Sequence, residues 1–107
     1  MRGSLDSDAD VVNEQELVTA LKEKGMSDPE TVDMLQRWCS AQEAEVEKAG
    51  TVDARIDFEL RRADVYFEAG YEDDSYNTFC DAMTLAEQLG RLDLCERVSA
   101  EMKKFSS

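Results

Sequence analysis

The sequence predicts an all-α protein with about five helices, arranged in antiparallel helix-turn-helix hairpins. Apolar residues recur three and four positions apart over most of the chain, which is the spacing that gives a helix one apolar face. No alternating pattern long enough for a strand interrupts them. Successive periodic stretches each end at a glycine, the residue that favours a helix C-terminus: Gly25, Gly50, Gly70 and Gly90.

The first two helices are expected at about 13–24 and 28–49. Asn13 can cap the first helix, because its side-chain oxygen can accept hydrogen bonds from the first free backbone N–H groups. Ser27 and Glu30 have the spacing of a capping box at the start of the second helix. The apolar face of that second helix consists of Val32, Leu35, Trp38, Cys39, Gln42, Val46 and Ala49.

The remaining helices are expected at about 52–69, 73–89 and 92–104. One face of the helix over 52–69 carries Ile56, Leu60, Ala63 and Phe67. Phe58 and Val65 form a second face, so this helix is expected to lie sandwiched between neighbours. The links between helices have only about two to four residues, which forces sequential helices to pack antiparallel.

The chain has 107 residues, enough for one compact domain, and a formal net charge of −13. We expect a flexible acidic tail over residues 1–12 and a single helical domain over 13–105. Met1–Ser4 is also typical of an expression tag. No apolar run approaches the roughly 18 residues of a membrane span, and no signal peptide opens the chain, so a cytoplasmic protein is expected.

The composition excludes several classes of function. The chain has no histidine, which rules out Ser-His-Asp triads and histidine-based zinc and di-iron sites. Its three cysteines stand far apart on apolar faces, where small buried side chains are expected: Cys39, Cys80 and Cys95. The negative charge argues against binding nucleic acid or an anionic membrane. We therefore expect no catalytic residues, no cofactor and no bound metal.

Part of the chain, residues 54–89, resembles the tetratricopeptide repeat. The residues that carry the resemblance are Ala63, Tyr66 and Gly70, followed by Ser75, Phe79 and Ala82. Small residues at such positions let the two helices of a hairpin approach closely, and aromatic residues fill the spaces between them. Glu59 and Arg62 stand where the family has its first-helix aromatic residue and leucine.

A weaker match to the same pattern occurs 45 residues earlier, where Leu21 corresponds to Tyr66 and Gly25 to Gly70. The resemblance implies a protein-interaction scaffold with a groove lined mainly by the first helix of each hairpin. In this chain those helices are the ones over 52–69 and 92–104.

The predicted partner-contact residues are Arg61, Arg62, Tyr71, Glu59 and Tyr66. Arg61 and Arg62 form a basic pair in an acidic chain, and guanidinium groups grip carboxylates with two hydrogen bonds. The alternative is pairing within the helix, since Asp57 precedes Arg61 by four residues and Glu59 precedes Arg62 by three. Tyr71, in a hairpin turn, is expected to be the most exposed aromatic residue and hence a contact residue.

These observations favour a non-catalytic protein–protein interaction module that binds another protein or a second copy of itself. One alternative is an acidic mimic of nucleic acid that blocks a basic cleft on a target protein, because carboxylates can stand in for phosphates. A third is a magnesium-dependent all-α nucleotide pyrophosphohydrolase. Its candidate ligands are Glu43, Glu45, Glu47, Asp57, Asp64 and Glu68, although the first three fan out around the helix and the tandem Glu-Glu motif of such enzymes is missing.

Overall fold

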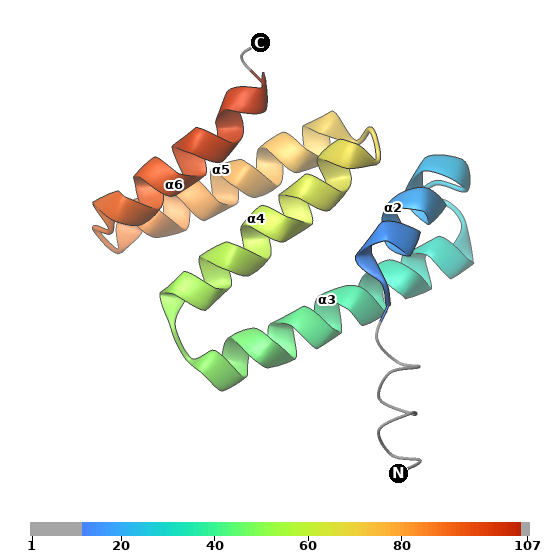
Figure 1. The fold of residues 1–107 in the computed structure, drawn as a ribbon, viewed down its shortest axis with the longest axis horizontal. Coiled ribbons are helices and arrows are strands. Elements are labelled where there is room, and N and C mark those ends of the chain that lie inside the picture. Colours follow the sequence, from blue (N-terminus) through green and yellow to red (C-terminus); the bar gives the residue numbers. More distant parts are fainter. Residues whose placement is uncertain (1–11, 106–107) are drawn as a thin grey trace.

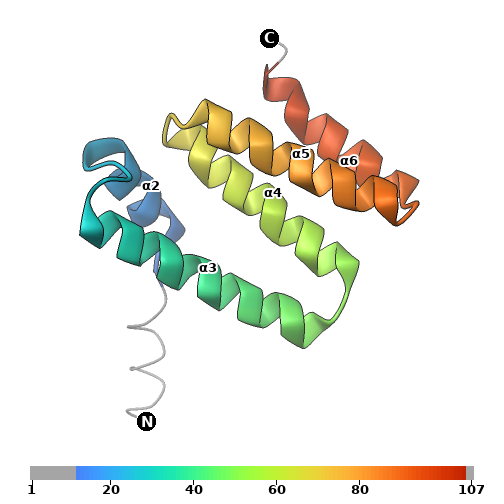
Figure 2. The same cartoon turned by 180° about the vertical axis from the view of Figure 1, so that it is seen from behind.

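The computed structural model describes residues 12–105, which form five α-helices and one closing 3-10 turn (Figures 1 and 2). The elements are α2 (Glu14–Glu23), α3 (Pro29–Ala49), α4 (Val52–Glu68), α5 (Glu72–Gln88), α6 (Leu92–Met102) and η1 (Lys103–Phe105). The all-α prediction is confirmed, and each helix begins and ends within two residues of its expected position. No strand occurs in the described part of the chain.

Capping side chains set where the first two helices begin. The Asn13 side chain accepts hydrogen bonds from the backbone N–H of Gln15, at 2.8 Å, and from that of Glu16, at 3.2 Å. The predicted capping box at Ser27 is wrong, because Asp28 is the N-cap of α3. The Asp28 carboxylate accepts from both the N–H and the hydroxyl of Thr31, at 3.2 and 3.1 Å. Asp28 thereby satisfies a hydroxyl that is fully buried.

Helix α4 occupies the centre of the structure. It contacts α2 and α3 on one side and α5 and α6 on the other, while α2 also packs on α3 and α5 on α6. From the turn at Gly50 and Thr51, α3 and α4 diverge like the arms of a V, and α2 lies towards its open end (Figure 1). Helices α4, α5 and α6 run close together (Figures 1 and 2).

Two separate hydrophobic clusters form on the two faces of α4. The first joins α2, α3 and α4 and contains Val12, Leu17, Val18, Leu21, Trp38, Val46, Phe58, Val65 and Ala69. The second joins α4, α5 and α6 and contains Ile56, Leu60, Ala63, Phe79, Ala82, Ala86, Leu94 and Val98. The expected sandwiching of the helix over 52–69 is thus confirmed.

The tail expected over residues 1–12 lies outside the described residues except for its last member. That residue, Val12, was expected in the flexible tail but is 8% exposed and belongs to the first hydrophobic cluster.

Small side chains bring α4 and α5 together. Ala63 of α4 and Ser75 and Ala82 of α5 are fully buried, as is Phe79 beside them. The Ser75 hydroxyl donates a hydrogen bond of 2.8 Å to the backbone carbonyl of Ala63, which satisfies the hydroxyl inside the contact. The six residues that carry the family resemblance include these four. Of the other two, Tyr66 is 9% exposed and Gly70 adopts a positive φ of 94° at the end of the hairpin turn.

The close approach of α4 and α5 gives a stability prediction. Replacing Ala63 with Leu inserts a large side chain where no space is free, so the free energy of unfolding is expected to fall by about 1–3 kcal/mol. The matched control is Ala44→Leu on the exposed surface of α3, which should change it by less than about 0.5 kcal/mol. Urea denaturation followed by circular dichroism measures both. Equal effects of the two substitutions would contradict the packing described.

Candidate partner-binding groove

A groove runs between α4 and α6 and contains a cavity of about 420 Å³. Its walls are lined by Asp57, Leu60, Arg61 and Asp64 from α4, and by Arg97 and Glu101 from α6. The charged residues of α4 stand four and three positions apart, and those of α6 four apart, so each set forms one stripe along its helix. Leu60 is 4% exposed and belongs to the second hydrophobic cluster, which therefore underlies the charged walls.

Ion pairs connect the two sides of this groove. Asp57 of α4 pairs with Arg97 of α6, and Asp64 of α4 pairs with Lys104 of η1. Nearer the α5–α6 turn, the Arg91 guanidinium lies 3.1 Å from Asp53 of α4 and 2.9 Å from Asp93. Exposed ion pairs add little stability individually. Their consequence here is that both signs of charge lie along the groove.

The hydrogen bonds from Arg91 also affect the titration of Asp93. They stabilise the ionised carboxylate and so hold the pKa of Asp93 below its ordinary value. Asp93 therefore stays ionised to lower pH in the folded chain than in an unfolded one.

Arg61 is exposed and borders the groove. Its guanidinium donates a hydrogen bond to the side-chain oxygen of Gln42 on α3, which links the groove to the neighbouring helix. Asp57, the partner considered for Arg61 within the helix, pairs with Arg97 instead. A guanidinium has five N–H donors, so Arg61 keeps donors with which to bind a carboxylate of another molecule.

Arg62 lies on a different side of α4 from Arg61, because neighbouring residues of a helix are about 100° apart. Its guanidinium contacts the Glu59 carboxylate at 2.6 Å and lies 5.7 Å from the centre of the Phe58 ring. Arg55 approaches the same ring, also at 5.7 Å. Arg62 therefore pairs within its own helix, which is the alternative given above. Through Phe58, it also lies at the contact between α3 and α4.

Two further predicted contact residues lie against Arg62 rather than on an open surface. The Glu59 side chain is only 14% exposed, and Tyr66 is 9% exposed. Burial raises the pKa of the Tyr66 hydroxyl. Burial likewise raises the pKa of the Cys39 thiol, which disfavours the reactive thiolate.

Tyr71 is not the exposed aromatic residue that was expected. It is half-buried against the first hydrophobic cluster, and its hydroxyl accepts a 3.1 Å hydrogen bond from the backbone N–H of Met26. Among the described aromatic residues, Tyr76 is the most exposed, at 48%, with its ring edge-to-face on Phe105. The expectation was wrong because the α2–α3 turn lies beside Tyr71 and covers part of its side chain.

Sequence reasoning missed Arg97 and Glu101, which form the α6 side of the groove, and Lys104 of η1, which pairs with Asp64. Arg97, Glu101 and Lys104 are four and three residues apart, the same spacing as in the charged stripe on α4. This shared spacing is visible in the sequence. The pairing of the two stripes requires α4 and α6 to lie side by side across α5, which spacing within each helix does not reveal.

The acidic residues considered as magnesium ligands do not converge. Within residues 12–105, no group of three or more His, Cys, Asp or Glu side chains is placed to hold a metal ion. Asp57 and Asp64 pair with Arg97 and Lys104, and Glu43 lies 3.8 Å from Arg55.

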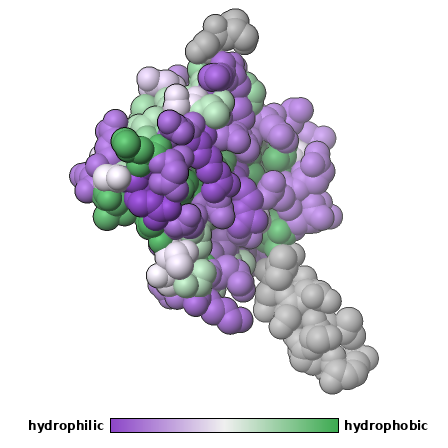
Figure 3. Space-filling model, turned by 60° about the vertical axis from the view of Figure 1, so that its left-hand side comes forward, coloured by the Kyte–Doolittle hydropathy of each residue, from purple (hydrophilic) through white to green (hydrophobic). Residues whose placement is uncertain are grey.

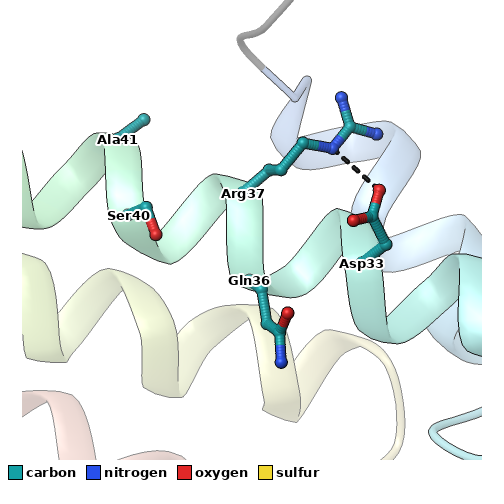
Figure 4. A pocket seen from close by; sticks show the side chains of 5 residues that line it. All are labelled: Asp33, Gln36, Arg37, Ser40 and Ala41. Atoms are coloured by element: carbon teal, nitrogen blue, oxygen red, sulfur yellow. Dashed lines mark hydrogen bonds and ion pairs between the residues drawn. The ribbon is translucent and has the colours of Figure 1, made fainter.

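A hollow on the outer surface of α3 makes a useful contrast with the groove. Its lining residues all come from this one helix: Asp33, Gln36, Arg37, Ser40 and Ala41 (Figure 4). Arg37 bonds to Asp33 at 2.9 Å, as a pair four residues apart on the same helix. No second described element supplies an opposing group, so we assign no site to this hollow.

Comparison of the chain with protein-family models, curated protein sequences and solved structures finds no match. Among residues 12–105, no helix is both long enough and apolar enough to cross a membrane.

The different positions of Arg61 and Arg62 give a stability prediction. Arg62→Ala removes the pair with Glu59 and the contact with Phe58, and is expected to lower the free energy of unfolding by about 1–2 kcal/mol. Arg61→Ala, one residue away on the exposed side, should lower it by less than about 0.5 kcal/mol. Chemical denaturation compares the two variants, and a larger loss in the Arg61 variant would contradict these roles.

Proposed function

We propose that this chain is a non-catalytic protein–protein interaction module whose partner binds along the groove between α4 and α6. The observation that carries the proposal is the position of Arg61, an exposed guanidinium at the border of a cavity walled by two helices. Arginine is enriched among the residues that dominate binding energy at protein interfaces. The groove suits a partner segment that presents a carboxylate to Arg61.

The arrangement of helices supports this proposal. Helices α2 and α4 contact each other, as do α4 and α6, although each pair is separated in the chain by a complete intervening helix. Such contacts are typical of stacked helical hairpins, which use extended surfaces to bind other proteins. We propose that the resemblance to the tetratricopeptide repeat reflects this stacking, with α4 and α5 as its clearest hairpin.

The charge distribution favours the interaction module over the acidic mimic of nucleic acid. A mimic needs a continuous ridge of unpaired carboxylates, whereas aspartates of α4 that face α6 pair with cations: Asp53 with Arg91, Asp57 with Arg97 and Asp64 with Lys104. The groove therefore presents both signs of charge, which suits a partner with a specific arrangement of groups rather than a uniformly basic cleft.

The proposal predicts that reversing the charge at Arg61 abolishes partner binding. Affinity capture from cells of the source organism, with quantitative mass spectrometry, should enrich a partner with the unmodified chain and lose it at least about tenfold with Arg61→Glu. The control is Arg37→Glu, which makes the same charge change at an exposed arginine on the outer surface of α3 and should retain the partner.

Two results would overturn this function. One is a partner retained equally by the Arg61 and Arg37 variants, which would place the binding surface elsewhere. The other is the absence of any protein enriched over a blank resin. Enrichment of the chain itself, together with a dimer in light scattering that Arg61→Glu dissociates, would identify the partner as a second copy.

A further inference from the structure

A single side chain connects the first hairpin turn to the second. Tyr71 follows the α4–α5 turn, and its hydroxyl reaches the α2–α3 turn. The two turns lie at the same end of the molecule (Figures 1 and 2). The hydroxyl accepts a hydrogen bond from the Met26 N–H at 3.1 Å and donates one to the Leu21 carbonyl at 3.4 Å. Gly25 completes the contact, because a Cβ added there would lie 3.4 Å from the Tyr71 hydroxyl.

The rest of the attachment of α2 and α3 to the molecule is limited to one face of α4. Phe58 and Val65 of α4, and Ala69 directly after it, are the buried members of the first hydrophobic cluster on this face. The centre of the Phe58 ring lies 6.0 Å from that of Trp38. The borders of this contact are polar, with Glu43 paired to Arg55 and Arg61 bonded to Gln42. Polar borders of this kind can be rehydrated when two elements separate, so they oppose separation weakly.

The α4–α6 part has a core that does not depend on this attachment. The second hydrophobic cluster draws all of its buried members from α4, α5 and α6. The covalent link between the two parts is the turn at Gly50 and Thr51, where Gly50 has a positive φ of 67°. Separation of α2 and α3 from α4 would leave the second cluster packed, and segments with fewer buried contacts open at lower free energy.

We propose that the α2–α3 hairpin opens as a unit about the Gly50–Thr51 turn while α4–α6 stays folded. The two hydrogen bonds of the Tyr71 hydroxyl, which we call the latch, stabilise the closed state. Opening exposes Phe58 and Val65 of α4, and Ala69 after it, to solvent. This behaviour belongs to the fold itself and is independent of the partner proposed above.

Hydrogen exchange of the full chain, followed by mass spectrometry in low concentrations of denaturant, tests the proposal. Amides of α2 and α3 should exchange through a common opening that is more frequent than the opening of α4–α6. Tyr71→Phe should increase exchange in α2 and α3 by about threefold to tenfold, which is the effect of losing one hydrogen bond. The control Tyr76→Phe, at the exposed tyrosine, should leave exchange in α2 and α3 unchanged.

A second pair of variants tests the same latch from the other side. Gly25→Ala places a strained positive-φ residue against the Tyr71 hydroxyl and should raise exchange in α2 and α3. Gly90 also has a positive φ, of 67°, but nothing lies within 4 Å of an added Cβ, so Gly90→Ala should raise exchange around the α5–α6 turn instead.

Three outcomes would overturn the proposal. The hairpin is not a separate unit if α2 and α3 exchange with the same opening free energy as α4–α6. Tyr71 is not its latch if the Phe variant leaves exchange unchanged, or if it raises exchange equally throughout the described residues.

Discussion

The structure depends on one constraint, which is that α4 has apolar residues on two faces and both faces must be buried. Phe58 and Val65 lie on one face of this helix, and Ile56, Leu60 and Ala63 lie on another. One neighbouring helix cannot cover both faces, since each apolar stripe needs its own partner. The chain therefore places one group of helices before α4 and another after it. The two hydrophobic clusters, the central position of α4 and the groove along its charged side all follow from this arrangement.

The charged residues of α4 show how the same helix also organises the surface. Between its two apolar faces lies the stripe that contains Asp57, Arg61 and Asp64, and α6 presents a matching stripe across the groove.

The face around the α5–α6 turn is largely hydrophilic with separate hydrophobic patches (Figure 3). Leu92 and Leu89 are exposed there, at 76% and 52%, on either side of Gly90. Single apolar residues at a turn are ordinary on a protein surface, and the charged groove remains the better candidate for binding.

Local signals allowed the helices to be predicted, because helix ends depend on residues that are close in the sequence. Asn13 and the glycines are examples, and even the error at Ser27 moved the start of α3 by a single residue. The ion pair of Arg62 was predictable, since its partner Glu59 lies in the same helix. The burial of Tyr71 and the pairing of Asp57 with Arg97 were not, because they require contacts between helices that are distant in the sequence.

The Tyr71–Met26 hydrogen bond joins residues 45 positions apart, the same offset at which Leu21 matches Tyr66 and Gly25 matches Gly70. This contact makes the length of the intervening chain a structural constraint. One residue inserted within α3 would rotate the preceding segment by about 100° and shift it by about 1.5 Å relative to α4, which would break either the Met26 bond or the Trp38 contact. Residues added at Gly90, beyond both partners, would leave that spacing intact. The chain should therefore tolerate changes of length after α5 far better than within α3.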